Sequence, residues 1–362
     1  MRWTLTEDQE LFRESFQGWL DRFASAEAVR GWLDSGDATG FERRFVQEGW
    51  FALGSPEEHG GQGGGLLELA LAAEQLGRAA APSAAWLGSV LAVPALAGLP
   101  ALAAASLGEG EFAVLAVDAG HPADAVGSVQ VDDGVLRGTV NRVLGADRAS
   151  RLIVPARPVG STDERALFLV DVADGPDVVV TARPLLDRSR SVADVTLAGA
   201  RGRRIDADAE TVLARAALRQ AALIGADSLG AAERMLDLAV EYSKQRHQFG
   251  APIGSFQAVK HAAATMLVAV ESARSIVYFA AASIDQGHPE AALHAAAAKA
   301  QVCASAEQVA DSALTVHGAI GYTWEHDLQL FYKRAKLNNR LFGGPEVWNE
   351  RLAAALPLVP AA

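Results

Sequence analysis

One polar stretch in the last third of the chain has the residue types to bind a phosphorylated ligand with a flat ring. Residues 246–257 read Arg-His-Gln-Phe-Gly-Ala-Pro-Ile-Gly-Ser-Phe-Gln. An arginine fork binds phosphate oxygens, a glutamine amide binds a polar ring edge, and phenylalanine packs on an apolar face. A solvated turn between two helices is the alternative, and the residues alone leave both open. The candidate ligand-binding residues are Arg246, Gln248 and Phe249.

Two long helices must position this stretch. Apolar residues recur at helical spacing over about 208–245 and again over 256–286, while Pro252 and Gly254 interrupt the pattern between them. Ser255 is placed to cap the second helix. Further helices are predicted at 289–316 and 327–339, so the C-terminal part is expected to be a four-helix bundle.

The rest of the chain predicts two other regions. Residues 1–107 read as helical, with Thr6 as an N-cap and helices at 41–50 and 66–77. Residues 112–205 change to short alternating runs, which predicts an antiparallel sandwich or barrel with a hairpin turn at 132–134. The expected domains are therefore 1–107, helical; 108–206, β; and 207–362, the four-helix bundle.

Composition limits the function. The chain has 362 residues, is 50% hydrophobic and carries a net charge of -12, so it is globular and suits neither nucleic acid nor an anionic membrane surface. Its single cysteine, Cys303, excludes an internal disulfide and fits a reducing cytoplasm. The acidic N-terminus does not resemble a signal peptide. Glu325, His326 and Asp327 are adjacent and do not converge on one ion, so no metal is expected.

A glycine-rich loop at 55–65 precedes the helix at 66–77. A dinucleotide fingerprint needs glycines at i, i+2 and i+5 after a strand. Counting from Gly61 and Gly63, the third position is Leu66, and no strand is predicted before the loop. A Rossmann site is therefore rejected.

Residues 246–257 resemble a characteristic segment of the acyl-CoA dehydrogenase family. Glu74 to Gly77, residues 138–149 and 186–195, and the loop 317–327 resemble other parts of the same family. The resemblance implies a mainly α fold with an N-terminal helical domain, a middle β-domain and a C-terminal four-helix bundle. It also implies FAD as cofactor, with the 246–257 segment, including Phe256 and Gln257, reaching the FAD of a neighbouring chain. The loop implies further FAD-binding residues, namely Thr315, His317, Gly318 and Gly321.

This sequence also departs from the family. The glutamine usual before the loop is Thr315, the second glycine of the usual pair is Ala319, and the usual flavin-side Trp and Thr/Ser fall on Val143 and Leu144. The catalytic base is the largest departure. Removing a weakly acidic α-proton needs a positioned carboxylate, but the two usual glutamate positions fall on Phe342 and Gln220. Glu346 is the remaining candidate base, and a solvated helix acid is its alternative reading.

The sequence thus predicts an FAD-dependent acyl-CoA dehydrogenase, or a subunit of one, that converts an acyl-CoA thioester to a 2,3-enoyl-CoA in lipid metabolism. The expected electron acceptor is electron-transfer flavoprotein. The expected assembly is a homo- or hetero-oligomer, with an α2β2 tetramer containing a glutamate-bearing paralogue as one arrangement. The alternative is a catalytically silent or non-oxidative subunit that completes a partner's flavin site.

Overall fold

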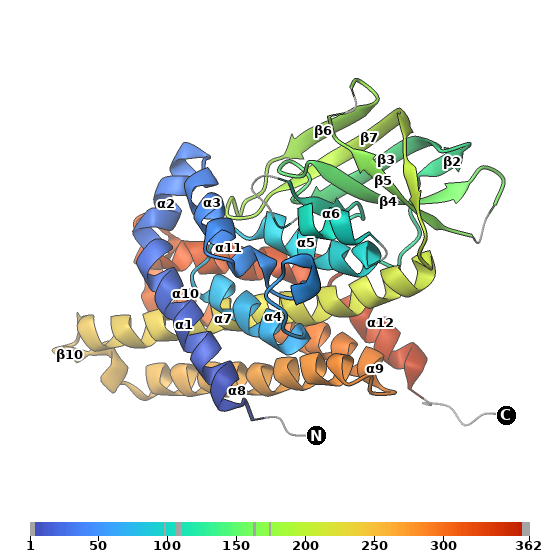
Figure 1. Ribbon diagram of the computed structural model, residues 1–362. Helices are drawn as coiled ribbons and strands as arrows, with labels where there is room; N and C mark the ends of the chain where they lie inside the picture. Colours follow the sequence, from blue (N-terminus) through green and yellow to red (C-terminus); the bar gives the residue numbers. More distant parts are fainter. Residues whose placement is uncertain are drawn as a thin grey trace. The chain divides into compact units, whose positions relative to one another are not determined.

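The computed structural model describes residues 4–97, 99–105, 107, 111–161, 164–173 and 175–356 (Figure 1). The chain divides into two compact units. The first, the helical unit, contains residues 1–31, 66–81 and 221–362, and the second, the sheet unit, contains 32–65 and 82–220.

Long helices with buried apolar stripes build the helical unit. Its elements are α1 (Glu7–Phe23), α4 (Leu66–Arg78), the greater part of α7 (Ala209–Gln245), α8 (Gln257–Asp285), α9 (Ala291–Ala297), α10 (Cys303–His317), α11 (Leu328–Arg340) and α12 (Pro345–Ala355). The predicted N-cap is confirmed, because Thr6 and Gln9 form a reciprocal capping box at the start of α1. The long predicted helices agree with the structure to within about two residues at most ends.

Three local predictions for this unit were incomplete or wrong. The helix expected at 289–316 is broken by a π-helical turn, η4 (Ala298–Val302), between α9 and α10. A fifth C-terminal helix, α12, follows Gly344 and begins with Pro345, a residue favoured in the first turn. Ser255 does not cap α8, because its hydroxyl donates to the Pro252 carbonyl and Phe256 is the N-cap.

Helices α4 and α7 touch backbone to backbone. A Cβ added at Gly77 would lie 2.1 Å from the Asp227 carbonyl oxygen, and one at Gly230 would lie 1.8 Å from the Glu74 carbonyl oxygen. Both distances are far inside van der Waals contact, so only glycine allows this crossing.

Replacing Gly230 with alanine should therefore force α4 and α7 apart and lower the free energy of unfolding by about 3 kcal/mol, the upper part of the range for overpacking. Urea denaturation followed by circular dichroism measures the loss. Gly18 faces open space, so Gly18→Ala on α1 is the matched control and should be neutral or slightly stabilising. Equal midpoints for the wild type and Gly230→Ala would contradict this packing.

The sheet unit is built on one eight-stranded sheet (Figure 1). The strands are β1 (Ala113–Leu115), β2 (Gln130–Asp132), β3 (Val135–Leu144), β4 (Arg151–Pro158), β5 (Ala166–Asp171), β6 (Val178–Arg183), β7 (Val192–Arg201) and β8 (Arg203–Ile205). Their order is β6-β7-β3-β2-β4-β5-β8, with β1 also paired to β4. Helices α3 (Thr39–Gln47), α5 (Ala84–Leu96) and α6 (Pro100–Ala105) belong to the same unit, and α2 (Ala26–Ser35) spans the boundary.

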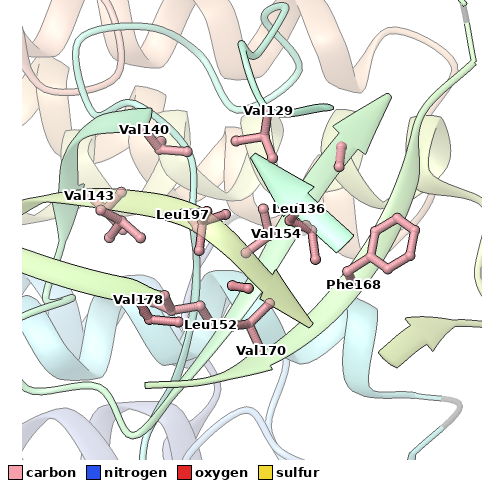
Figure 2. Close-up of a cluster of buried hydrophobic side chains, with 14 of the residues drawn as sticks. Val129, Leu136, Val140, Val143, Leu152, Val154, Phe168, Val170, Val178 and Leu197 are labelled. Atoms are coloured by element: carbon pink, nitrogen blue, oxygen red, sulfur yellow. The ribbon is translucent and has the colours of Figure 1, made fainter. Parts of the chain in front are cut away.

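Alternating side chains of these strands form the core of the sheet unit. Figure 2 shows the buried cluster, which includes Val129, Leu136, Val140, Val143, Leu152, Val154, Phe168, Val170, Val178 and Leu197. The predicted hairpin turn is confirmed, because Asp133 and Gly134 both have positive φ between β2 and β3. The all-antiparallel expectation needs correction: β4 pairs in parallel with both β1 and β2.

By length and apolar composition alone, α8 could cross a membrane. This is weak evidence, because a core helix passes the same test, and 44% of the tested window is buried inside the structure.

Candidate functional site

The polar stretch 246–257 forms a tight hairpin between α7 and α8. Strands β9 (His247–Gln248) and β10 (Ala251–Pro252) pair in antiparallel fashion, and the Ile253 N–H closes the hairpin by donating to the Arg246 carbonyl at 2.8 Å. Phe249 and Gly250 at the tip have φ of 53° and 78°. A left-handed conformation strains a phenylalanine by roughly 1–2 kcal/mol, so this turn holds Phe249 in a place that local preference disfavours.

The predicted ligand-binding side chains of the hairpin point to solvent. Phe249 is 95% exposed, and its ring meets the Phe256 ring edge to face at a centroid distance of 6.1 Å. Arg246, Gln248 and Gln257 are also exposed. The hairpin therefore presents a cation, two amides and an aromatic pair outward, where a ligand or another chain can contact them.

The second set of predicted ligand-binding residues lies at the end of α10 and in η5 (Gly318–Tyr322). It comprises Thr315, His317, Gly318 and Gly321. His317 is buried, and its Nδ1 lies 2.7 Å from the Ala313 carbonyl, to which it donates. Gly318 has φ 64° and ψ −141°, a conformation reserved for glycine. Gly321 is buried, with only 3.0 Å between an added Cβ and the Leu314 side chain. Thr315 is exposed, and its hydroxyl donates to the Asp311 carbonyl.

An aromatic cluster brings the two predicted groups together. Tyr242, in the last turn of α7, stacks on His317 with a centroid distance of 4.7 Å. His326 completes the cluster at 4.5 Å from His317 and 6.3 Å from Tyr242. The hairpin begins one helical turn after Tyr242, so this stack holds its start close to the residues that follow His317. Tyr242 and His326 are not predicted from the sequence as positioning residues, because nothing local marks a stack between residues so far apart in the chain.

This cluster should make stability depend on pH. Burial lowers the pKa of both His317 and His326 below the ordinary value of 6.5, and mutual repulsion with His326 adds to the effect at His317. The unfolded chain then binds more protons than the folded one just below pH 6.5. The stability that the two neutral histidines contribute is therefore present above pH 6.5. It is lost as the pH falls through the lowered pKa values.

We expect the Tm to fall between pH 7.5 and pH 5.5, with about 1.4 kcal/mol lost for each unit by which a pKa is lowered. His317→Phe keeps a ring against Tyr242 and removes the titrating group, so its Tm should vary less with pH. Differential scanning fluorimetry across this range tests the prediction. His261→Phe, at an exposed position of α8, serves as control; the same slope in both variants would refute the role of His317.

The three candidate base positions are unlike one another. Phe342 is buried at 1% exposure with φ 57°, and its carbonyl accepts from the Trp348 indole at 3.0 Å. Gln220, in α7, is also 1% exposed, and its Oε1 accepts from the Ala123 N–H at 2.9 Å. The side chain of Glu346, at the start of α12, is 65% exposed and faces Arg340 at 3.3 Å. Glu346 thus has the setting of a surface ion pair.

The fold and these two groups define a known class of flavoenzyme. The family models "Acyl-CoA dehydrogenase, N-terminal domain" and "Acyl-CoA dehydrogenase, C-terminal domain" match residues 6–101 and 211–356. The chain belongs to the acyl-CoA dehydrogenase family, and FAD is its cofactor.

Three similar proteins match nearly the whole length of this chain. Acyl-CoA dehydrogenase IpdE2 of Mycolicibacterium smegmatis is 34% identical, and the match spans 97% of this chain and 99% of that protein. A chain of the ChsE4-ChsE5 complex from Mycobacterium tuberculosis superposes with a TM-score of 0.87 at 28% identity, covering 100% of both chains. Acyl-CoA dehydrogenase FadE34 of M. tuberculosis is 33% identical, and this chain spans 48% of its length.

The exposed groups of the hairpin fit the chemistry of FAD. The cofactor has a doubly charged pyrophosphate, polar ring edges and flat apolar ring faces. Arg246 can meet the phosphate, Gln248 a polar edge, and the Phe249–Phe256 pair an apolar face. The open space around Gly318, where an added Cβ would meet nothing within 4 Å, allows close approach of a ligand to the backbone.

Proposed function

We propose that this chain is the subunit of a heteromeric acyl-CoA dehydrogenase that completes a flavin site without providing the catalytic base. The whole enzyme would convert an acyl-CoA to its 2,3-enoyl-CoA, and a second, glutamate-bearing subunit would supply the carboxylate. Two of each subunit would form an α2β2 tetramer, with electron-transfer flavoprotein as electron acceptor and the cytoplasm as location.

The absence of a sheltered carboxylate at the usual base positions carries this proposal. Abstraction of a weakly acidic α-proton requires a carboxylate held against the substrate. Neither the Phe342 ring nor the Gln220 amide can accept a proton, and Glu346 is solvated and paired with Arg340. Catalytic carboxylates are commonly held in a buried setting, whereas the side chain of Glu346 is 65% exposed.

The remaining site residues have binding roles in this proposal. The Arg246 guanidinium would bind a phosphate of FAD, Gln248 and Gln257 would bind polar ring atoms, and Phe249 with Phe256 would cover an apolar surface. His317, Gly318 and Gly321 would shape the adjoining loop, with Thr315 at its rim. When bound, FAD supplies the hydride acceptor for desaturation.

The similarity to a chain of the ChsE4-ChsE5 complex supports an assembly of two kinds of subunit. The exposed ring pair of Phe249 and Phe256 supports contact of the hairpin with another chain. We also propose the division into domains 1–107, 108–206 and 207–362. The matched family models fall within the first and third of these ranges. Residues 108–110 and 357–362 lie outside the described part of the chain.

The visible absorption spectrum tests this function. The chain is purified alone and also after coexpression with a glutamate-bearing paralogue, and each sample is titrated anaerobically with mixed acyl-CoAs. We expect flavin bleaching in the complex only. Bleaching by the chain alone at ordinary enzymatic rates would refute the proposal, because this chain would then have its own base.

Changing Glu346 to glutamine should alter kcat of the complex by less than about twofold. If Glu346 were the base, its loss would lower kcat by about 10²- to 10⁴-fold. Steady-state turnover with a dye acceptor distinguishes the two cases. Glu350→Gln, also exposed on α12, is the matched control for loss of a surface charge.

A further inference from the structure

Three side chains that commonly bind metals converge at the junction of α8 and α9. They are His288 and Glu290, in the connection between the two helices, and His294, on α9. One ligand atom of each lies within 4.8 Å of the corresponding atoms of the others. We propose that this cluster binds a zinc-type divalent ion, which ties the segment after α8 to the start of α9.

The two rings are held near each other by their surroundings. The imidazole centroids of His288 and His294 are 5.1 Å apart. Phe279, on α8, packs its ring against His294 at 4.6 Å in an edge-to-face arrangement. Because Phe279 and His294 come from different helices, the packing of the bundle fixes where the second imidazole lies.

A buried hydroxyl group orients His294 for metal binding. Ser283, on α8, is fully buried, and its Oγ lies 2.7 Å from His294 Nδ1. This contact occupies Nδ1 and leaves Nε2 for an ion. Metal-bound histidines usually have such a partner on the other ring nitrogen, because it sets the ring angle and the tautomer.

The ligand set also suits a cation. Neutral imidazole is the form of histidine that coordinates metals. Glu290 adds a negative charge. Two imidazoles and one carboxylate with an open fourth position are a common ligand set for Zn²⁺, and Co²⁺ tolerates the same set.

His288 limits the affinity. Its Nδ1 accepts a hydrogen bond from the Glu290 N–H at 3.1 Å, so in the neutral ring the proton is on Nε2. Coordination through Nε2 would move this proton to Nδ1 and break that bond. We therefore expect an affinity weaker than that of a fully preorganised zinc site.

No metal is predicted from the sequence, because the adjacent residues at 325–327 do not converge on one ion. His288 and His294 are six residues apart, on opposite sides of a helix start. Their convergence depends on how the chain turns between α8 and α9, which the sequence pattern does not reveal.

Isothermal titration of the EDTA-treated full chain with Zn²⁺ tests the site, and the visible bands of Co²⁺ give an independent readout. We expect one ion per chain in the wild type. His294→Ala and His288→Ala should abolish saturable binding, and Ser283→Ala should raise Kd by about tenfold to a hundredfold. Zn²⁺ should raise the Tm of the wild type and leave that of His294→Ala unchanged.

His261→Ala is the control, because His261 is exposed on α8 and outside the cluster. It should bind like the wild type. Circular dichroism in EDTA checks that each variant is folded. If His294→Ala does not fold, His288→Ala, on the connecting segment, tests the site instead. No saturable binding by the wild type, or unchanged binding by folded His294→Ala and His288→Ala, would overturn the proposal. Neither result depends on flavin or on a partner subunit.

Discussion

Changing Arg246 to glutamine is expected to weaken FAD binding by the assembled enzyme by about tenfold to a hundredfold. A hydrogen bond to a charged group contributes about 1.5–3 kcal/mol, and each 1.4 kcal/mol is a factor of ten in Kd. Arg246 is exposed at the start of the hairpin, so the substitution should remove a ligand contact without opening the core. FAD content and Kd, measured by the change in flavin fluorescence, report the effect.

Two further variants separate charge from geometry. Arg246→Lys keeps the charge and loses the planar fork, so its loss of affinity should be intermediate. Lys244→Gln removes an exposed cation two residues earlier in the chain and should leave FAD binding nearly unchanged. If Arg246→Gln retained FAD as the wild type does, Arg246 would not be a phosphate ligand, whatever the subunit composition.

Breaking the buried ion pair of the helical unit should have the largest effect on stability. Arg334 and Asp227 are almost fully buried, with Nη1 and Oδ2 2.9 Å apart. The arginine also donates to the Ala81 carbonyl at 2.8 Å, and Asn338 donates to Asp227 at 2.7 Å. Asp227→Leu or Arg334→Met removes one charge of this pair and leaves the opposite charge buried. Each should lower the free energy of unfolding by about 3–5 kcal/mol.

A double-mutant cycle tests the cause. The double variant Asp227→Leu/Arg334→Met removes both charges, so it should be more stable than either single variant. Arg340→Met breaks the exposed pair with Glu346 and should cost less than about 1 kcal/mol. Urea midpoints measure all four variants; additive losses in the double variant would show that the two charges do not stabilise each other.

Much of the fold follows from local patterns. The capping box at Thr6, the turn at Asp133-Gly134 and the ends of α7 and α8 depend on residues a few positions apart. Such interactions form within one turn of chain, so sequence reasoning finds them. Pro345 likewise marks the start of α12, because proline is favoured in the first turn of a helix.

Pairing between distant segments could not be predicted in this way. Strand β4 pairs in parallel with β1 and β2, although an alternating pattern looks alike in parallel and antiparallel pairs. The π-helical turn at Ala298–Val302 contains a fully buried lysine, Lys299, whose ammonium donates to the Asn338 and Gly343 carbonyls. No local residue preference reveals these partners, because they lie 39 and 44 residues further along the chain, in α11 and in the turn after it.

The amino-acid sequence alone shows which chemical groups the site has. Arg246, Gln248 and Phe249 lie in the hairpin, and residues 220 and 342 are not carboxylates. Which of these groups are exposed to solvent, and which contact one another, depends on the tertiary structure. Burial of Gln220, exposure of Glu346 and the stacking of Tyr242 on His317 all arise from packing between segments far apart in the chain. Solvation controls whether a carboxylate is basic and whether a ring is free to bind, so these properties become visible only when the helices are in place.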